Sequence, residues 1–147
     1  MNNAANPDPV LDALDGFRRS KTMFAAVALG VFDCLERSPA DAATLAAEIH
    51  AHAEPLDRLL GACVGLGFLR KQDGRYFNQP VASTYLCRAS DRTLTGYILY
   101  SNDVLFRLWA HLEDAVREGG HRWKQAFNAR APSSIISSRP TKPCGPS

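Results

Sequence analysis

The chain has 147 residues, of which 46% are hydrophobic and 22% are charged, and its formal net charge is +2. This length and composition predict one globular domain. No apolar run approaches the roughly 18 residues that a membrane span requires, and the first residues lack the basic and apolar layout of a secretory signal. We therefore expect a cytoplasmic protein without a membrane partner.

The small positive charge comes from the C-terminal segment. Arg130, Arg139 and Lys142 lie there, and the segment contains no acidic residue. Without these three, the 17 basic side chains fall to 14, against 15 acidic side chains. Non-specific binding to nucleic acid requires a concentrated basic face. The charge distribution therefore argues against a nucleic-acid partner.

Neither the cysteines nor the histidines predict a metal site or a disulfide framework. The cysteines contain no Cys-x-x-Cys pair, and we interpret the first three as small core residues. The histidines lack the spacing of a ligand set, so we expect them to be solvated or to cap helices. These residues are Cys34, Cys63, Cys87 and Cys144, and His50, His52, His111 and His121.

The apolar pattern begins with a helix after Pro9, and residues 1–9 are expected to be disordered. Val10, Leu14 and Phe17 repeat at helical spacing, and a wider apolar stripe extends from Ser20 to Leu35. A stripe of this width needs two surfaces to pack against, and we expect one of them to be a second subunit. The residues predicted for this dimer interface are Leu14, Phe17, Met23, Phe24, Val27 and Val31.

Two more helices and a hairpin follow in the sequence. Thr44 is predicted to cap one helix through its hydroxyl group, and a second helix opens at Glu54-Pro55 and ends at Gly65 and Gly67. Asp73-Gly74 between two short runs predicts a β-hairpin, because both central turn positions need positive φ. The expected fold is mainly α, a winged helix-turn-helix with a small β-hairpin and extra flanking helices.

The helical pattern continues to the end of this region. A short helix is expected from Pro80 to Leu86, one or two longer helices from Asp91 to Gly119, and the pattern persists to Phe127. This part of the chain contains four aromatic residues for which we favour core packing. They are Tyr97, Tyr100, Phe106 and Trp109.

Several motifs in this order resemble one protein family. They are Phe17-x-x-Ser20-Lys21-x-x-Phe24, Leu29-Gly30-Val31-Phe32-Asp33, Gly65-x-Gly67-Phe68-Leu69, Ser83-x-Tyr85-Leu86 and Trp109-x-x-Leu112. Together they resemble the N-terminal dimerisation domain of small-molecule O-methyltransferases, the group that includes hydroxyindole, plant phenolic and bacterial polyketide enzymes. The resemblance covers about residues 10–127.

The resemblance implies an obligate dimer, formed by two copies or with a full-length methyltransferase. In the family the N-terminal helices intertwine between subunits and help to line the partner's acceptor pocket. The resemblance also gives an alternative to core packing for Tyr97, Tyr100, Phe106 and Trp109, which is a position bordering the acceptor pocket.

In the family a separate C-terminal domain binds S-adenosylmethionine and supplies a histidine base. A nucleotide-type site needs a strand, a glycine turn and a helix in that order. The cluster Gly61-x-x-x-Gly65-x-Gly67 instead lies at a predicted helix end, before a strand. We therefore expect no catalytic, cofactor-binding or metal-binding residue in this chain, and no S-adenosylmethionine bound by it.

The pattern is lost from residue 128, and residues 128–147 are expected to be disordered. If the codons from about residue 128 are read in a shifted frame, they can encode an acidic amphipathic helix in place of this tail. On this hypothesis the chain is a methyltransferase that is truncated before its catalytic domain, and it is inactive alone.

Two other functions stay open from the sequence. One is a winged-helix regulator of transcription. Its recognition helix would be Pro55–Leu66, and its wing would contact DNA phosphates through Arg70, Lys71 and Arg75. Major-groove readers need Arg, Asn, Gln or Lys on the exposed helix face, and this helix offers Arg58 beside acidic neighbours. The other alternative is a free-standing interaction module that pairs with a full-length methyltransferase and regulates it.

Overall fold

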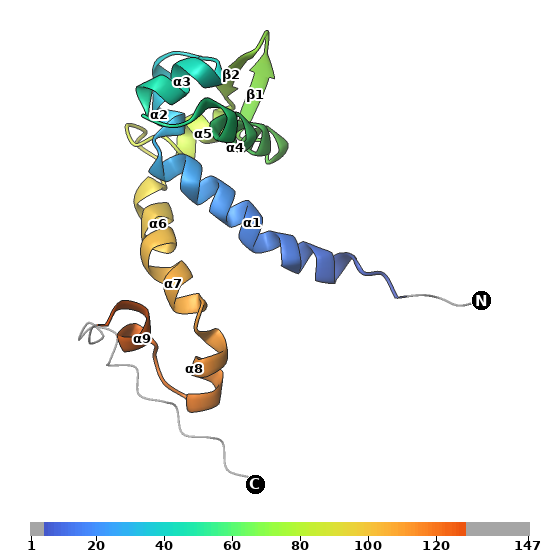
Figure 1. The fold of residues 1–147 in the computed structure, drawn as a ribbon, viewed down its shortest axis with the longest axis vertical. Helices are drawn as coiled ribbons and strands as arrows, with labels where there is room; N and C mark the ends of the chain where they lie inside the picture. The colour runs from blue at the N-terminus through green and yellow to red at the C-terminus, as the bar shows by residue number, and fades with distance from the viewer. Residues whose placement is uncertain (1–4, 129–147) are drawn as a thin grey trace. The chain divides into compact units, whose positions relative to one another are not determined.

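The computed structural model describes residues 5–128. The described chain divides into two units, of which the first ends at Asn102 and the second begins at Asp103. Figure 1 shows that both units are mainly helical and that the first carries a two-stranded antiparallel sheet. The predicted fold class is therefore confirmed. Within residues 5–128, every helix is too short or too polar to span a lipid bilayer.

The first unit begins with two helices that meet at a glycine. Helix α1 (Asp8–Ala28) starts two residues before the predicted helix, and α2 is Val31–Arg37. Gly30 between them has a φ of 74°, the left-handed conformation that glycine adopts without steric cost. The apolar stripe predicted from Ser20 to Leu35 is therefore divided between two helices that run in different directions.

The next two helices are α3 (Ala42–Glu48) and α4 (Ala53–Gly65). The carboxylate of Asp41 accepts a hydrogen bond of 2.7 Å from the backbone N–H of Thr44. The prediction that Thr44 caps α3 is therefore wrong, because the cap is Asp41, one residue before the helix. This backbone hydrogen bond also lowers the pKa of Asp41.

The predicted hairpin consists of β1 (Leu69–Gln72) and β2 (Arg75–Asn78), with Leu69 opposite Asn78 and Gln72 opposite Arg75. Asp73 and Gly74 have φ values of 49° and 75°, which confirms the two-residue turn with two positive φ angles. Ala40, in the segment between α2 and α3, forms an antiparallel bridge with Tyr76. Helices α2, α3 and α4 followed by this hairpin give the winged helix.

The core of the first unit is formed by side chains from α1 to α6. Phe32 packs edge to face on Phe68, with ring centroids 6.3 Å apart. The predictions for Cys34, Cys63 and Cys87 are confirmed, because all three are buried free thiols. The other large side chains that are almost completely buried are Val27, Val31, Leu45, Leu60, Leu69 and Tyr76.

Polar contacts connect the wing to its neighbouring helices. The carboxylate of Glu36 on α2 accepts hydrogen bonds from the Ser83 hydroxyl at 2.6 Å and from the Asn78 amide at 2.7 Å. The hydrogen bond from Ser83 lowers the pKa of Glu36 most, and the hydrogen bond from Asn78 lowers it further. Ser83 lies on α5 (Pro80–Tyr85), the short helix that the sequence predicts. Glu36 therefore joins α2, β2 and α5.

The first unit ends with α6 (Thr95–Tyr100), which packs against α1. Thr95 and Ile98 are buried, whereas Tyr97 is 67% exposed and Tyr100 is also exposed. Core packing, the interpretation favoured from the sequence, is therefore wrong for both tyrosines. The physical reason is helical periodicity, because these tyrosines lie off the face of α6 that Thr95 and Ile98 bury.

The second unit consists of short helical segments. A π-helical turn (Ser101–Leu105) crosses its boundary, and α7 (Phe106–Trp109), α8 (Leu112–Glu118) and α9 (Trp123–Phe127) follow. The Arg107 guanidinium lies 4.4 Å from the Phe127 ring centroid and donates to the carbonyl of Ala126 at 2.9 Å. Phe106 and Trp109 are exposed, so core packing is wrong for them too.

Candidate dimerisation surface

The N-terminal half of α1 is a helix with little cover from its own chain. Residues 8–19, called the α1 arm below, are all exposed except Gly16, which is half-buried. Figure 1 shows this part of α1 extending away from the winged-helix elements of the first unit. Its apolar side chains Val10, Leu11, Leu14 and Phe17 are 63%, 51%, 56% and 55% exposed. The arm therefore presents to solvent the residue types that proteins normally bury.

Three of these side chains form one row along the arm. Val10, Leu14 and Phe17 are spaced by four and three residues, so they project from the same face of the helix. The next position of the row is Lys21, whose Nζ donates a hydrogen bond of 2.7 Å to the Asn102 side chain. Asn102 follows the end of α6, so the row faces the side of α1 on which α6 packs.

Charged residues occupy other faces of the arm. Asp8, Asp12 and Asp15 lie in its first part, and Arg18 and Arg19 lie at its end. The Arg18 guanidinium donates to the Asp15 carboxylate at 2.9 Å, and both side chains are more than half exposed. A surface ion pair of this kind contributes little stability. The arm is therefore an amphipathic helix with one apolar row.

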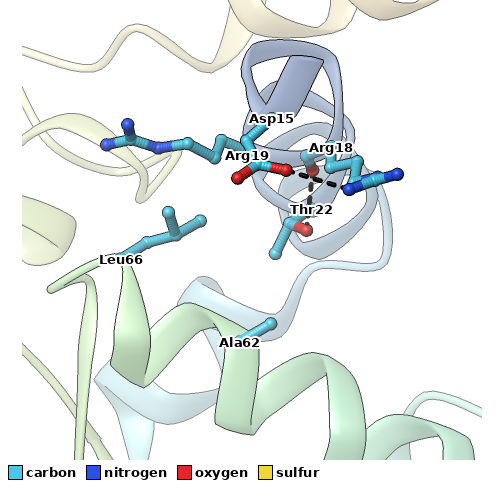
Figure 2. A pocket seen from close by; sticks show the side chains of 6 residues that line it. All are labelled: Asp15, Arg18, Arg19, Thr22, Ala62 and Leu66. Atoms are coloured by element: carbon cyan, nitrogen blue, oxygen red, sulfur yellow. Dashed lines mark hydrogen bonds and ion pairs between the residues drawn. The ribbon is translucent and has the colours of Figure 1, made fainter. Parts of the chain in front are cut away.

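A hollow of about 250 Å³ lies between α1 and α4, and its lining residues are Asp15, Arg18, Arg19, Thr22, Ala62 and Leu66. Figure 2 shows the Arg18–Asp15 pair and the Thr22 hydroxyl, which donates to the backbone carbonyl of Arg18 at 2.9 Å. All three charged side chains of the lining are exposed. The hollow is therefore a solvated recess beside the arm rather than a built ligand site.

The structure divides the six residues predicted for the dimer interface. Phe24, Val27 and Val31 are 8%, 2% and 0% exposed, so they stabilise the core of a single chain. Met23 is half-buried and packs against the same core. Leu14 and Phe17 lie on the exposed row of the arm, and their role in an interface stays a prediction.

The surface that a DNA-binding winged helix would use is occupied by internal contacts. Asp57 on α4 accepts a hydrogen bond of 2.6 Å from the Tyr76 hydroxyl and lies 3.3 Å from Lys71 Nζ. The Tyr76 hydrogen bond, and then the Lys71 contacts, lower the pKa of Asp57. Arg70 lies over the Phe77 ring at 4.0 Å. The basic residues of the wing are thus engaged by an acid and by aromatic rings.

Arg75 and Arg58, the other cations of this surface, also contact protein groups. Arg75 donates to the backbone carbonyl of Pro39, and Arg58 forms an exposed ion pair with Glu54 at 3.4 Å. Base reading requires free donors on the exposed face of the helix. This arrangement gives no support to the regulator alternative.

Catalytic and metal chemistry find little support in the described part of the chain. Burial raises the pKa of Cys63 to about 11, and burial with the nearby charges of Glu36 and Asp33 raises that of Cys87 to about 11. Both thiols are therefore protonated at neutral pH and are poor nucleophiles. Residues 5–128 contain no group of three or more His, Cys, Asp or Glu side chains that could hold a metal ion.

The glycine cluster also lies as the sequence predicts. Gly65 is the last residue of α4, and Gly67, with a φ of 79°, connects that helix to β1. The order is helix, glycine turn and strand, which is the reverse of a dinucleotide-binding turn.

A protein-family model described as the O-methyltransferase dimerisation domain matches residues 11–88, which is more than half of the chain. The chain belongs to this family. The matched segment contains α1 from Leu11 onward, with Leu14 and Phe17 of the exposed row, and the whole winged helix.

Individual relatives of this dimerisation domain agree with the family assignment. The acetylserotonin O-methyltransferase of Mus musculus is 37% identical over 128 residues, which is 83% of this chain and 33% of the relative. The structure of human N-acetylserotonin methyltransferase in complex with SAM has a TM-score of 0.81 and 33% identity, covering 92% of this chain and 42% of that one. The structure of PigF with SAH has a TM-score of 0.82 and 28% identity, and the match covers 90% of this chain and 39% of that one.

The dimerisation domain is a minor part of these relatives. The chain spans between 20% and 37% of the length of the curated proteins it matches.

The sequence alone did not identify the Lys21–Asn102 contact, although a lysine in an otherwise apolar row is a signal for such a partner. The contact between Asp57 and Tyr76 has no comparable signal, because it joins residues from two elements.

Proposed function

We propose that this chain is the dimerisation region of a small-molecule O-methyltransferase that uses S-adenosylmethionine. The observation that carries the proposal is the exposed apolar row of the α1 arm in a chain of the dimerisation-domain family. Support for the methyltransferase comes from relatives that are named acetylserotonin O-methyltransferase and from solved neighbours with SAM or SAH.

The arm supports self-association on physical grounds. Short helices are marginal in water, and most helical stability in proteins comes from packing an apolar face. The row formed by Val10, Leu14 and Phe17 has little packing within the described chain. Contiguous apolar surface of this kind usually marks an interface. A second copy of the chain, or a full-length methyltransferase with the same domain, provides the partner.

The methyl transfer itself lies outside residues 5–128 in this proposal. The glycines of this region end a helix before a strand, and the buried thiols are protonated, so the region is expected to bind no S-adenosylmethionine and to be inactive alone. Tyr97, Tyr100, Phe106 and Trp109 are exposed on the surface. Their contribution to an acceptor pocket is part of the proposal, because exposed aromatic side chains suit contact with a flat phenolic or indole substrate.

Two measurements on the purified 147-residue chain test this function. Light scattering coupled to size-exclusion chromatography should give the mass of a dimer, and calorimetric titration with S-adenosylmethionine should give no saturable heat. A monomer over the whole accessible concentration range would overturn the dimerisation role. Saturable binding of S-adenosylmethionine would instead contradict the assignment of cofactor binding to another part of the enzyme.

A further inference from the structure

We draw no further inference here: the strongest candidate, the apolar face of α8 in the second unit that presents Leu112 and Val116 to solvent, carries no proposal because nothing in residues 5–128 shows what covers it.

Discussion

The hydroxyl group of Tyr76 on β2 donates a 2.6 Å hydrogen bond to the carboxylate of Asp57 on α4. Tyr76 is 1% exposed, and Lys71 on β1 lies 3.3 Å from the same carboxylate and 4.7 Å from the Tyr76 ring centroid. The helix and the wing that would face DNA in a regulator are therefore joined to each other. The acid of α4 and the lysine of the wing stabilise the fold together.

This contact predicts a specific dependence of stability on pH. The folded-state pKa of Asp57 is lowered, chiefly by the Tyr76 hydrogen bond, so its stabilisation is present above the ordinary value of 3.8 and is lost as the pH falls through the folded-state pKa. We expect Asp57→Asn to be less stable than the unsubstituted chain at neutral pH, and we expect the difference in unfolding free energy to narrow as the pH falls below 3.8. Urea unfolding of both proteins at several pH values measures this. A difference that does not change with pH would exclude an ionised Asp57 as the cause.

The two helices that meet at Gly30 give a second prediction. A Cβ at Gly30 would meet only the Arg88 guanidinium, at 4.0 Å, so the cost of Gly30→Ala comes from its φ of 74°. We expect a loss of about 1–2 kcal/mol in the free energy of unfolding. Gly61→Ala is the matched control, because Gly61 lies inside α4 with open space around it and should gain about 0.5–1 kcal/mol. Thermal unfolding of both variants checks the opposite signs.

The core of the winged helix predicts a large effect at Leu60. This side chain is 0% exposed, so Leu60→Ala removes buried methyl groups and is expected to cost about 2–5 kcal/mol of unfolding free energy. Leu94 is 49% exposed, and Leu94→Ala is expected to cost about 1 kcal/mol or less. Chemical unfolding gives both values. Equal costs would mean that the packing around Leu60 differs from that described.

The internal contacts of the wing predict weak binding to DNA. Lys71 and Arg70 already contact protein groups, and Arg58 is paired with an acid. We expect fluorescence anisotropy to show no binding of a mixed-sequence duplex at physiological salt. The combined variant Asp57→Asn and Glu54→Gln removes both acids and is the appropriate comparison. Tight, salt-dependent binding of the duplex by the unsubstituted chain would instead support the alternative function of a DNA-binding regulator.

Much of the fold could be predicted because its signals are local. The Asp73-Gly74 turn needs two positive φ angles, and two neighbouring residues provide them. Other features depend on contacts between distant segments, which periodicity does not encode. A local signal can also be ambiguous: Asp41 rather than Thr44 caps α3, although both residue types are good caps and the two residues lie only three positions apart.

The candidate interface shows the same limit. Apolar periodicity in α1 is identical for a residue that packs in its own core and for one that packs on a partner. Phe24 and Val27 are buried in the core of the first unit, whereas Leu14 and Phe17 are exposed. The sequence could not place this boundary, because it depends on where α1 leaves the rest of the unit.

The central claim is that the exposed row of the α1 arm mediates self-association. Sedimentation equilibrium of the unsubstituted chain, compared with Leu14→Glu, tests it most directly, and Arg19→Glu, an exposed change on another face of the arm, is the control. The account predicts a dimer for the unsubstituted chain, a dimer weakened less than threefold for Arg19→Glu, and at least a hundredfold weaker association for Leu14→Glu, since about 3 kcal/mol is needed to bury an unpaired carboxylate. Unchanged association of Leu14→Glu would contradict it.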